Sequence, residues 1–337
     1  MAEPVLIWGA GAIGGTFGAT LKRAGQDVSF VDIVPEHVAA IRDPARGLRI
    51  TGPVDPMRVT APAFTPETLQ GTWKRIFLAV KAHHTDEAAR ALRPHLADDG
   101  YVVSLQNGLC EDIIASVVGR QRTIGAFINF GADWIAPGEI MYGNRAAVVV
   151  GEIDGRITPR LKELHALMQV FEPDAILTDD IWSYLWGKLG YGTLLFAQGI
   201  CELGIADTLA RPELLPLWRD LAGEVMDVAR AEGISPRGFN GFDPDAFGQA
   251  GLEERARRSV AAMVAFNRPN AKTHSGIWRD LAVRKRRTEV DMQLVPIVAA
   301  GQQHGVACPK LKGLIDMIHA VEDGKRGLSD RNLVELL

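Results

Sequence analysis

The residue of greatest chemical interest in the sequence is a lysine in apolar surroundings. Lys188 is the only charged side chain in the range 181–201, which is apolar on nearly every face of a predicted helix. Such a lysine can bury its stem and extend its ammonium to the surface, or it can hold the ammonium in a cleft between domains. Partial desolvation lowers the pKa of an ammonium, so a lysine in a cleft could donate a proton near neutral pH. The glycines around it suggest that a ligand approaches the helix backbone closely: Gly187, Gly190 and Gly192.

Two further polar side chains follow the ends of predicted strands. Lys81 comes after the apolar run 76–80, and Asn107 comes after the run 101–105. Ligands of open α/β sheets bind at the carboxyl ends of the strands, so both residues are candidates for binding a cofactor or substrate. The alternative interpretations are a solvated loop lysine and a tight Asn-Gly turn.

A basic tract, Arg284–Arg287, stands close before Glu289. One interpretation is a solvated basic face. If the tract is helical and Glu289 faces the cleft, helical spacing brings Lys285 and Arg286 to the same side. One of them could then attract an anionic substrate.

A glycine fingerprint for dinucleotides stands near the start of the chain. Gly9, Gly11 and Gly14 fit G-x-G-x-x-G, directly after a predicted strand and at the start of a helical pattern. The next apolar run ends in Asp32, about 20 residues further on, where an acid is expected to bind a ribose hydroxyl. A carboxylate there repels a 2′-phosphate, so the sequence predicts NAD in preference to NADP. The predicted cofactor-binding residues are Gly9, Gly11, Ala12, Ile13, Gly14, Asp32, Lys81 and Asn107.

The elements that must position these residues form two different patterns. The first half alternates short apolar runs with helical patterns, which is typical of a Rossmann-type, doubly wound α/β sheet. From about Asp180 long helical patterns dominate, among them Thr288–His304. We therefore predict a dinucleotide-binding domain over residues 1–178 and an all-α substrate and catalytic domain over residues 179–337.

The bulk composition excludes several classes of protein. The 337 residues carry a net charge of −4, which gives no general attraction to nucleic acid or to an anionic membrane. The long apolar stretch 181–201 contains a lysine, a glutamine and four glycines, so a buried core helix is the better interpretation. The three cysteines are far apart and lack a CxxC, which predicts neither disulfides nor a metal site. The expectations are a cytoplasmic location and no nucleic-acid or membrane partner.

With these residues collected, the chain resembles the 2-dehydropantoate 2-reductase (ketopantoate reductase) family. The resemblance covers nearly the whole length and rests on an ordered set of motifs: GAGAIG, AVKAHHT, SLQNGL, LWGKL, GEV, RRTEVD and HGVACP. It implies a Rossmann domain with a helical domain like that of 6-phosphogluconate dehydrogenase. It also implies reduction of a 2-oxo acid to a 2-hydroxy acid by hydride transfer from a nicotinamide.

The resemblance assigns roles to individual residues. Lys188 matches the catalytic lysine that protonates the carbonyl oxygen, and Glu289 matches the glutamate that contacts substrate and helps hold that lysine. Asn107 and Lys81 match residues near the nicotinamide and the substrate, and Ser275 matches a substrate-binding serine. The expected partner is a small hydroxy or oxo acid, and a homodimer is the expected assembly.

Three departures from the family pattern affect the predicted substrate and cofactor. The family helix usually carries asparagines four and eight residues after its lysine, where this chain has Gly192 and Phe196. Many members carry an arginine near Asp32 and use NADP. One alternative is therefore an NAD-dependent dehydrogenase of another hydroxy acid or sugar acid in catabolism. The other is a non-catalytic protein that senses NADH.

Overall fold

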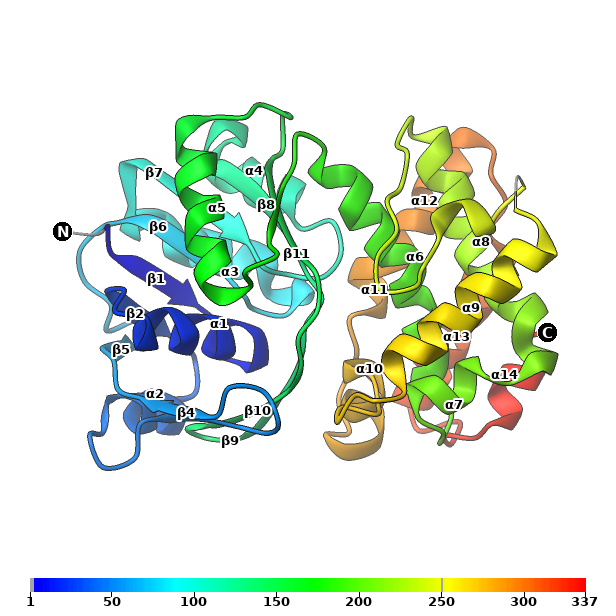
Figure 1. Ribbon diagram of the computed structural model, residues 1–337, viewed down its shortest axis with the longest axis horizontal. Coiled ribbons are helices and arrows are strands. Elements are labelled where there is room, and N and C mark those ends of the chain that lie inside the picture. Colours follow the sequence, from blue (N-terminus) through cyan, green and yellow to red (C-terminus); the bar gives the residue numbers. More distant parts are fainter. Residues whose placement is uncertain (1–2, 250) are drawn as a thin grey trace. The chain divides into compact units, whose positions relative to one another are not determined.

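The computed structural model describes residues 3–249 and 251–337 and divides the chain into two compact units (Figure 1). Unit 1 ends at Ile181 and unit 2 begins at Trp182. Unit 1 is built on a mostly parallel sheet with helices, and unit 2 is helical, so the predicted fold class is confirmed.

An eight-stranded sheet forms the centre of unit 1, in the order β12-β11-β8-β7-β6-β1-β2-β5. All neighbouring pairs are parallel except β8 and β11, which are antiparallel. All residues of β1 and β2 are buried, as expected for apolar strands covered on both faces. The strands are β1 Val5–Trp8, β2 Val28–Val31, β5 Ala63–Phe64, β6 Trp73–Leu78, β7 Leu96–Ser104, β8 Thr123–Ile128, β11 Val148–Glu152 and β12 Ile176–Leu177.

Helices connect these strands and cover the sheet (Figure 1). Phe17 of α1 packs against Phe77 of β6 and Phe171 of α5, with ring centroids 4.9 and 5.4 Å apart. These contacts fix α1, whose N-terminus follows β1 through the glycine loop. The α-helices of unit 1 are α1 Ala12–Arg23, α2 Pro35–Arg42, α3 Thr85–Leu92, α4 Glu111–Val118 and α5 Pro159–Phe171.

A second, four-stranded sheet in unit 1 does not appear among the predictions. Its order is β4-β3-β10-β9, and it pairs strands from distant parts of the chain. It packs on α1, where a side chain at Gly15 would meet Ile140 of β10. The strands are β3 Leu48–Thr51, β4 Met57–Val59, β9 Gly131–Ala136 and β10 Glu139–Asn144.

Unit 2 contains helices and, among its described residues, no named strand. The predicted helix Thr288–His304 is wrong as one element, because the structure begins a new helix at Val295. Pro296 lies in the first turn of that helix, where its missing N–H breaks no helical hydrogen bond. The helices are α6 Ile181–Gly199, α7 Ile205–Leu209, α8 Leu215–Ala231, α9 Glu253–Asn267, α10 Gly276–Trp278, α11 Val290–Gln293, α12 Val295–His304, α13 Pro309–Glu322 and α14 Arg331–Glu335.

The long apolar helix α6 is mainly buried within the protein. Across the described residues, no helix combines the length and apolar character that crossing a bilayer requires.

Candidate functional site

The three glycines of the fingerprint differ in their structural surroundings. Gly9 has φ +99°, and a side chain there would lie 2.9 Å from the backbone of Ala79. A side chain at Gly14 would collide with the carbonyl oxygen of Gly9 and lie 2.8 Å from Ile7 Cγ2. At Gly11, by contrast, a Cβ would meet nothing within 4 Å. The first and third glycines are therefore required by packing, and the second leaves an open space beside the backbone.

The open space lies at the N-terminus of α1. Gly11 is the N-cap residue of α1, and no side chain caps this helix end. Gly11, Ala12 and Ile13 are partly exposed, whereas the following two turns are buried. The first N–H groups of a helix lack internal partners and carry its positive dipole end, so they attract an anion. The loop therefore fits the pyrophosphate of a dinucleotide, as its sequence predicts.

Substituting the second and third glycines should separate binding from folding. Gly14→Ala should destabilise unit 1 by about 1–3 kcal/mol through overpacking, measured by urea unfolding. Gly11→Ala should leave stability nearly unchanged, because its φ of −68° suits any residue, but should weaken dinucleotide binding by about tenfold. Equal loss of stability in both variants would contradict these assignments.

Asp32 is held next to this loop by two backbone amides. Its Oδ2 accepts a hydrogen bond from Ala10 N at 2.9 Å, and its Oδ1 accepts one from Val34 N at 3.0 Å. Each carboxylate oxygen has a second lone pair, so the group can also accept hydrogen bonds from ribose hydroxyls. The side chain is partly exposed, as such a role requires.

Lys81 follows β6 and Asn107 follows β7, and these two strands are neighbours in the sheet. Both residues lie at the carboxyl ends of their parallel strands, as the glycine loop does at the end of β1. Lys81 is partly exposed at the N-cap of a short 3₁₀ helix. Asn107 is exposed, and Gly108 after it has φ +87°, so the Asn-Gly turn is present and still presents the side chain to solvent. Unit 1 therefore brings Lys81 and Asn107 to the same end of the sheet as the glycine loop and Asp32, the end formed by the carboxyl ends of the parallel strands.

The accessible residues of α6 form one stripe. Apart from Trp182 near its start, the partly exposed residues of α6 are Tyr184, Lys188, Gly192 and Leu195. All other residues of the helix are buried. Their spacings of four, four and three residues place them on one helix face. A Cβ at Gly192 would meet nothing within 4 Å, so the stripe is open one turn after Lys188. The expectation of a close ligand is wrong for Gly187 and Gly190, because a side chain there would collide with other parts of unit 2. Tyr184 and Leu195 are missing from the predicted site, although helical spacing from Lys188 could have identified them.

Glu289 and Ser275 lie in the segment between α9 and α11. Glu289 is only 6% exposed and is the N-cap residue of α11. Ser275 is buried, its hydroxyl accepts a hydrogen bond from Trp278 N, and its own N–H donates to Gln198 Oε1 of α6. This contact places Ser275 beside the end of α6, whereas Phe196 of that helix is turned into the core.

The helical hypothesis for the basic tract is wrong. Residues 285–288 are not helical, and Lys285 has φ +51°. Arg286 donates to the buried carboxylate of Asp280 at 2.9 Å, and Arg287 pairs with Glu322 at 3.1 Å. Both arginines are therefore ion-paired within unit 2, and helical spacing gives no link to Glu289.

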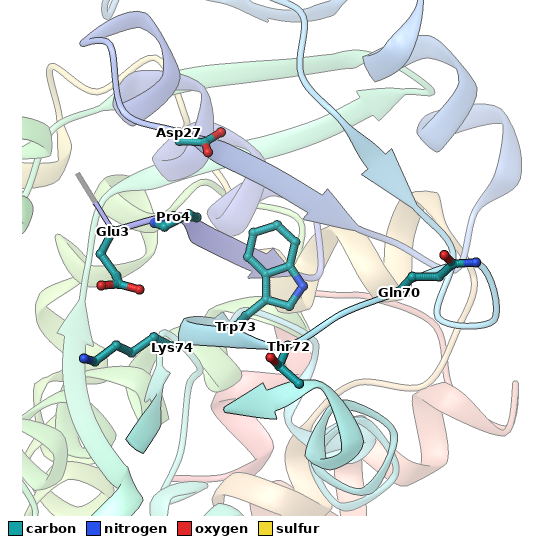
Figure 2. A pocket seen from close by; sticks show the side chains of 7 residues that line it. All are labelled: Glu3, Pro4, Asp27, Gln70, Thr72, Trp73 and Lys74. Atoms are coloured by element: carbon teal, nitrogen blue, oxygen red, sulfur yellow. The ribbon is translucent and has the colours of Figure 1, made fainter. Parts of the chain in front are cut away.

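A pocket lies on unit 1 at the amino ends of strands of the large sheet (Figure 2). It is lined by residues that precede or begin β1, β2 and β6: Glu3, Pro4, Asp27, Gln70, Thr72, Trp73 and Lys74. Lys74 already pairs with Asp99 at 2.7 Å. Because dinucleotides bind at the carboxyl ends of strands, this pocket does not belong to the candidate site. Within the described residues we find no cluster of His, Cys, Asp and Glu that could hold a metal ion.

The chain is similar to known proteins over nearly all its length. The family model described as ketopantoate reductase PanE/ApbA matches residues 5–155, and the model for the C terminal part of that family matches residues 180–322. A 2-dehydropantoate 2-reductase of Pyrococcus abyssi is 35% identical, over 95% of this chain and 99% of that protein.

Solved structures agree on the fold. A PanE/ApbA family ketopantoate reductase from Ralstonia eutropha JMP134 superposes with a TM-score of 0.77 at 27% identity, covering 96% of this chain and 99% of that one. The ternary structure of D-mandelate dehydrogenase with NADH and anilino(oxo)acetate gives a TM-score of 0.83 at 22% identity, covering 95% and 99%. The two family models together cover most of the chain, which therefore belongs to the ketopantoate reductase PanE/ApbA family of oxidoreductases.

Proposed function

We propose that the protein interconverts a 2-oxo acid and its 2-hydroxy acid with NAD(H), as in the pair 2-dehydropantoate and pantoate. The observation that supports this most is Lys188, the one charged side chain on the accessible stripe of an otherwise buried apolar helix. Family membership supports the same class of reaction.

In this proposal, Lys188 moves the proton. A bound nicotinamide supplies the hydride in reduction and accepts it in oxidation. The Nζ of Lys188 donates a proton to the carbonyl oxygen of the 2-oxo acid, or takes one from the hydroxyl in the reverse direction. Its positive charge also stabilises the negative charge that develops on that oxygen.

Other residues bind and orient the reactants. Asn107 and Lys81 follow the strands next to the glycine loop, which suits them to the cofactor and substrate. Glu289 and the hydroxyl of Ser275 orient the substrate, and Glu289 also helps hold Lys188 in position. Fixing the reacting atoms at close range supplies part of the rate enhancement.

The proposed cofactor is NAD rather than NADP. Asp32 keeps its carboxylate beside the glycine loop through the amides of Ala10 and Val34. A carboxylate in this position favours the two hydroxyls of an unmodified ribose and repels a phosphate.

The second candidate is a dehydrogenase for another hydroxy acid or sugar acid in catabolism. It is favoured by Gly192, which leaves open space one turn from Lys188 where the family usually has an asparagine. Leu195 adds an apolar side chain to the same stripe. Of these substrates, a hydroxy acid with a larger and less polar substituent than pantoate would suit this face better than a sugar acid.

Filling that space should change substrate preference. Gly192→Leu should raise the KM of a branched or aromatic 2-oxo acid by about tenfold and change the KM of pyruvate by less than about threefold. The matched control is Gly327→Leu, at another glycine that has open space around it and a φ outside the left-handed region. It should change the KM of neither substrate. Equal effects of Gly192→Leu on both substrates would contradict a role in specificity.

A substrate screen tests the proposed function. The purified protein is assayed with NADH and NADPH against 2-oxo acids that include 2-dehydropantoate, and with NAD against hydroxy and sugar acids. We expect NADH-dependent reduction of at least one 2-oxo acid. Tight NADH binding without any turnover would instead support a sensor of NADH.

We further infer a cytoplasmic location from the cysteines. Cys110, Cys201 and Cys308 are all buried, and none forms a disulfide. A reducing compartment suits this arrangement. The homodimer stays a prediction, to be tested by light scattering of the purified protein.

A further inference from the structure

A buried histidine joins the dinucleotide loop to the second sheet of unit 1. His37 lies in the first turn of α2, five positions after Asp32, and its side chain is fully buried. Its Nε2 lies 2.8 Å from the carbonyl oxygen of Ala10 in the glycine loop. Its Nδ1 lies 2.9 Å from the backbone N of Gly138, in the turn between β9 and β10.

The two partners fix the protonation of the ring. The amide of Gly138 can only donate a hydrogen bond, so Nδ1 must be the unprotonated acceptor. The carbonyl of Ala10 can only accept, so Nε2 must carry the hydrogen. His37 is therefore held as the neutral Nε2–H tautomer.

The bond to Ala10 also sets the direction of the next amide. The Ala10 carbonyl and the Gly11 N–H belong to one planar trans peptide, so they point in opposite directions. Holding the oxygen toward buried His37 therefore aims the Gly11 N–H away from α2. Asp32 holds the preceding peptide through Ala10 N in the same way. Two successive peptide planes of the loop are thus fixed by side chains that stand just after β2.

The other end of the bridge is equally constrained. Gly138 has φ +81°, follows Pro137 in a two-residue turn, and would place a Cβ 2.7 Å from that of Ala40 on α2. Its carbonyl also accepts from Arg49 N of β3 at 2.8 Å. The turn therefore packs closely against α2, the helix that carries His37.

We propose that His37 is a positioning residue for the cofactor. It orients the Gly11 amide toward a phosphate oxygen of the dinucleotide and anchors the glycine loop to the β9–β10 turn. The inference rests on the nucleotide binding of the proposed function, and it adds a residue that does not itself touch the nucleotide.

Two variants that each replace one ring nitrogen by an amide group separate this role from a merely structural one. Gln places an amide near the position of Nε2, so His37→Gln keeps a donor for Ala10 and loses the bond to Gly138. Asn places its amide near the position of Nδ1, so His37→Asn keeps an acceptor for Gly138 and loses the bond to Ala10. Each variant loses one bond of the bridge, so urea unfolding should show similar losses of stability.

The affinities for NADH and for ADP-ribose, which lacks the nicotinamide, are then measured by fluorescence and calorimetry. We expect His37→Asn to weaken both by about tenfold, because a misaligned amide loses a hydrogen bond to a charged phosphate. His37→Gln should stay within about threefold of the wild type. Equal losses of nucleotide affinity in both variants, or wild-type affinity in His37→Asn, would overturn the role of His37. The proposed function would still stand in that case, because the wild-type protein would bind the nucleotide and turn over its substrate. Absence of nucleotide binding by the wild-type protein would instead overturn both.

Discussion

Replacing Lys188 with alanine is expected to lower kcat/KM for the best 2-oxo acid by about a hundredfold or more. The variant loses both the proton donor and the positive charge that stabilises the developing oxyanion. The affinity for NADH should stay within about threefold of the wild type, because unit 1 supplies the glycine loop and Asp32. Steady-state kinetics and an NADH titration of the same preparation measure the two effects.

Two controls make this result specific. Lys312→Ala removes an exposed lysine of α13 in the same unit and should leave kcat/KM unchanged. Added primary amines should partly restore the activity of Lys188→Ala, since they return a proton donor to the open stripe near Gly192. A fall in kcat/KM smaller than about threefold for Lys188→Ala would exclude this lysine as the general acid.

The second large effect concerns cofactor choice. The wild type should bind NADH more tightly than NADPH by about a hundredfold. Like charges 4 Å apart repel by about 4 kcal/mol near a protein surface, and even half of that exceeds a tenfold change in affinity. Asp32→Ser should weaken NADH binding by about tenfold and reduce the preference over NADPH. Fluorescence titration with both nucleotides checks these values.

The contacts of Asp32 with the glycine loop affect nucleotide binding in addition to its charge, so the two effects must be separated. Its carboxylate holds the amides of Ala10 and Val34, so part of any loss of affinity comes from a looser loop. That part weakens both nucleotides alike, whereas lost repulsion affects only NADPH. The ratio of the two dissociation constants therefore isolates the charge effect. Tighter binding of NADPH than of NADH by the wild type would contradict the proposed cofactor.

The large sheet and its glycine loop could be predicted because their signals are local. Buried parallel strands give apolar runs such as Val5–Trp8, and the loop glycines follow directly in sequence. The four-stranded sheet depends on pairing β3 with β10, about 90 residues apart, and no local pattern records such a pairing. The contact between His37 and Gly138 escaped prediction for the same reason.

Unit 2 shows where helical spacing predicts the position of a residue correctly and where it does not. Lys188 and Gly192 share a helix face, as their spacing of four residues requires, because nothing interrupts α6. Spacing fails for Glu289, because residues 285–288 before it are not helical and Lys285 has φ +51°. It also fails for the predicted helix Thr288–His304, because a new helix begins there with Pro296 in its first turn. Contacts such as that of Ser275 with Gln198 depend on tertiary packing.

Isotope transfer tests the central claim most directly. The purified protein is incubated with NADH deuterated at the transferable position of nicotinamide C4 and with the best 2-oxo acid from the screen. Proton NMR and mass spectrometry of the product should show one deuterium at C2 of the 2-hydroxy acid, and its formation should be about a hundredfold slower in Lys188→Ala. A product without deuterium, or the same rate of transfer in Lys188→Ala, would contradict NADH-dependent reduction with Lys188 as the proton donor.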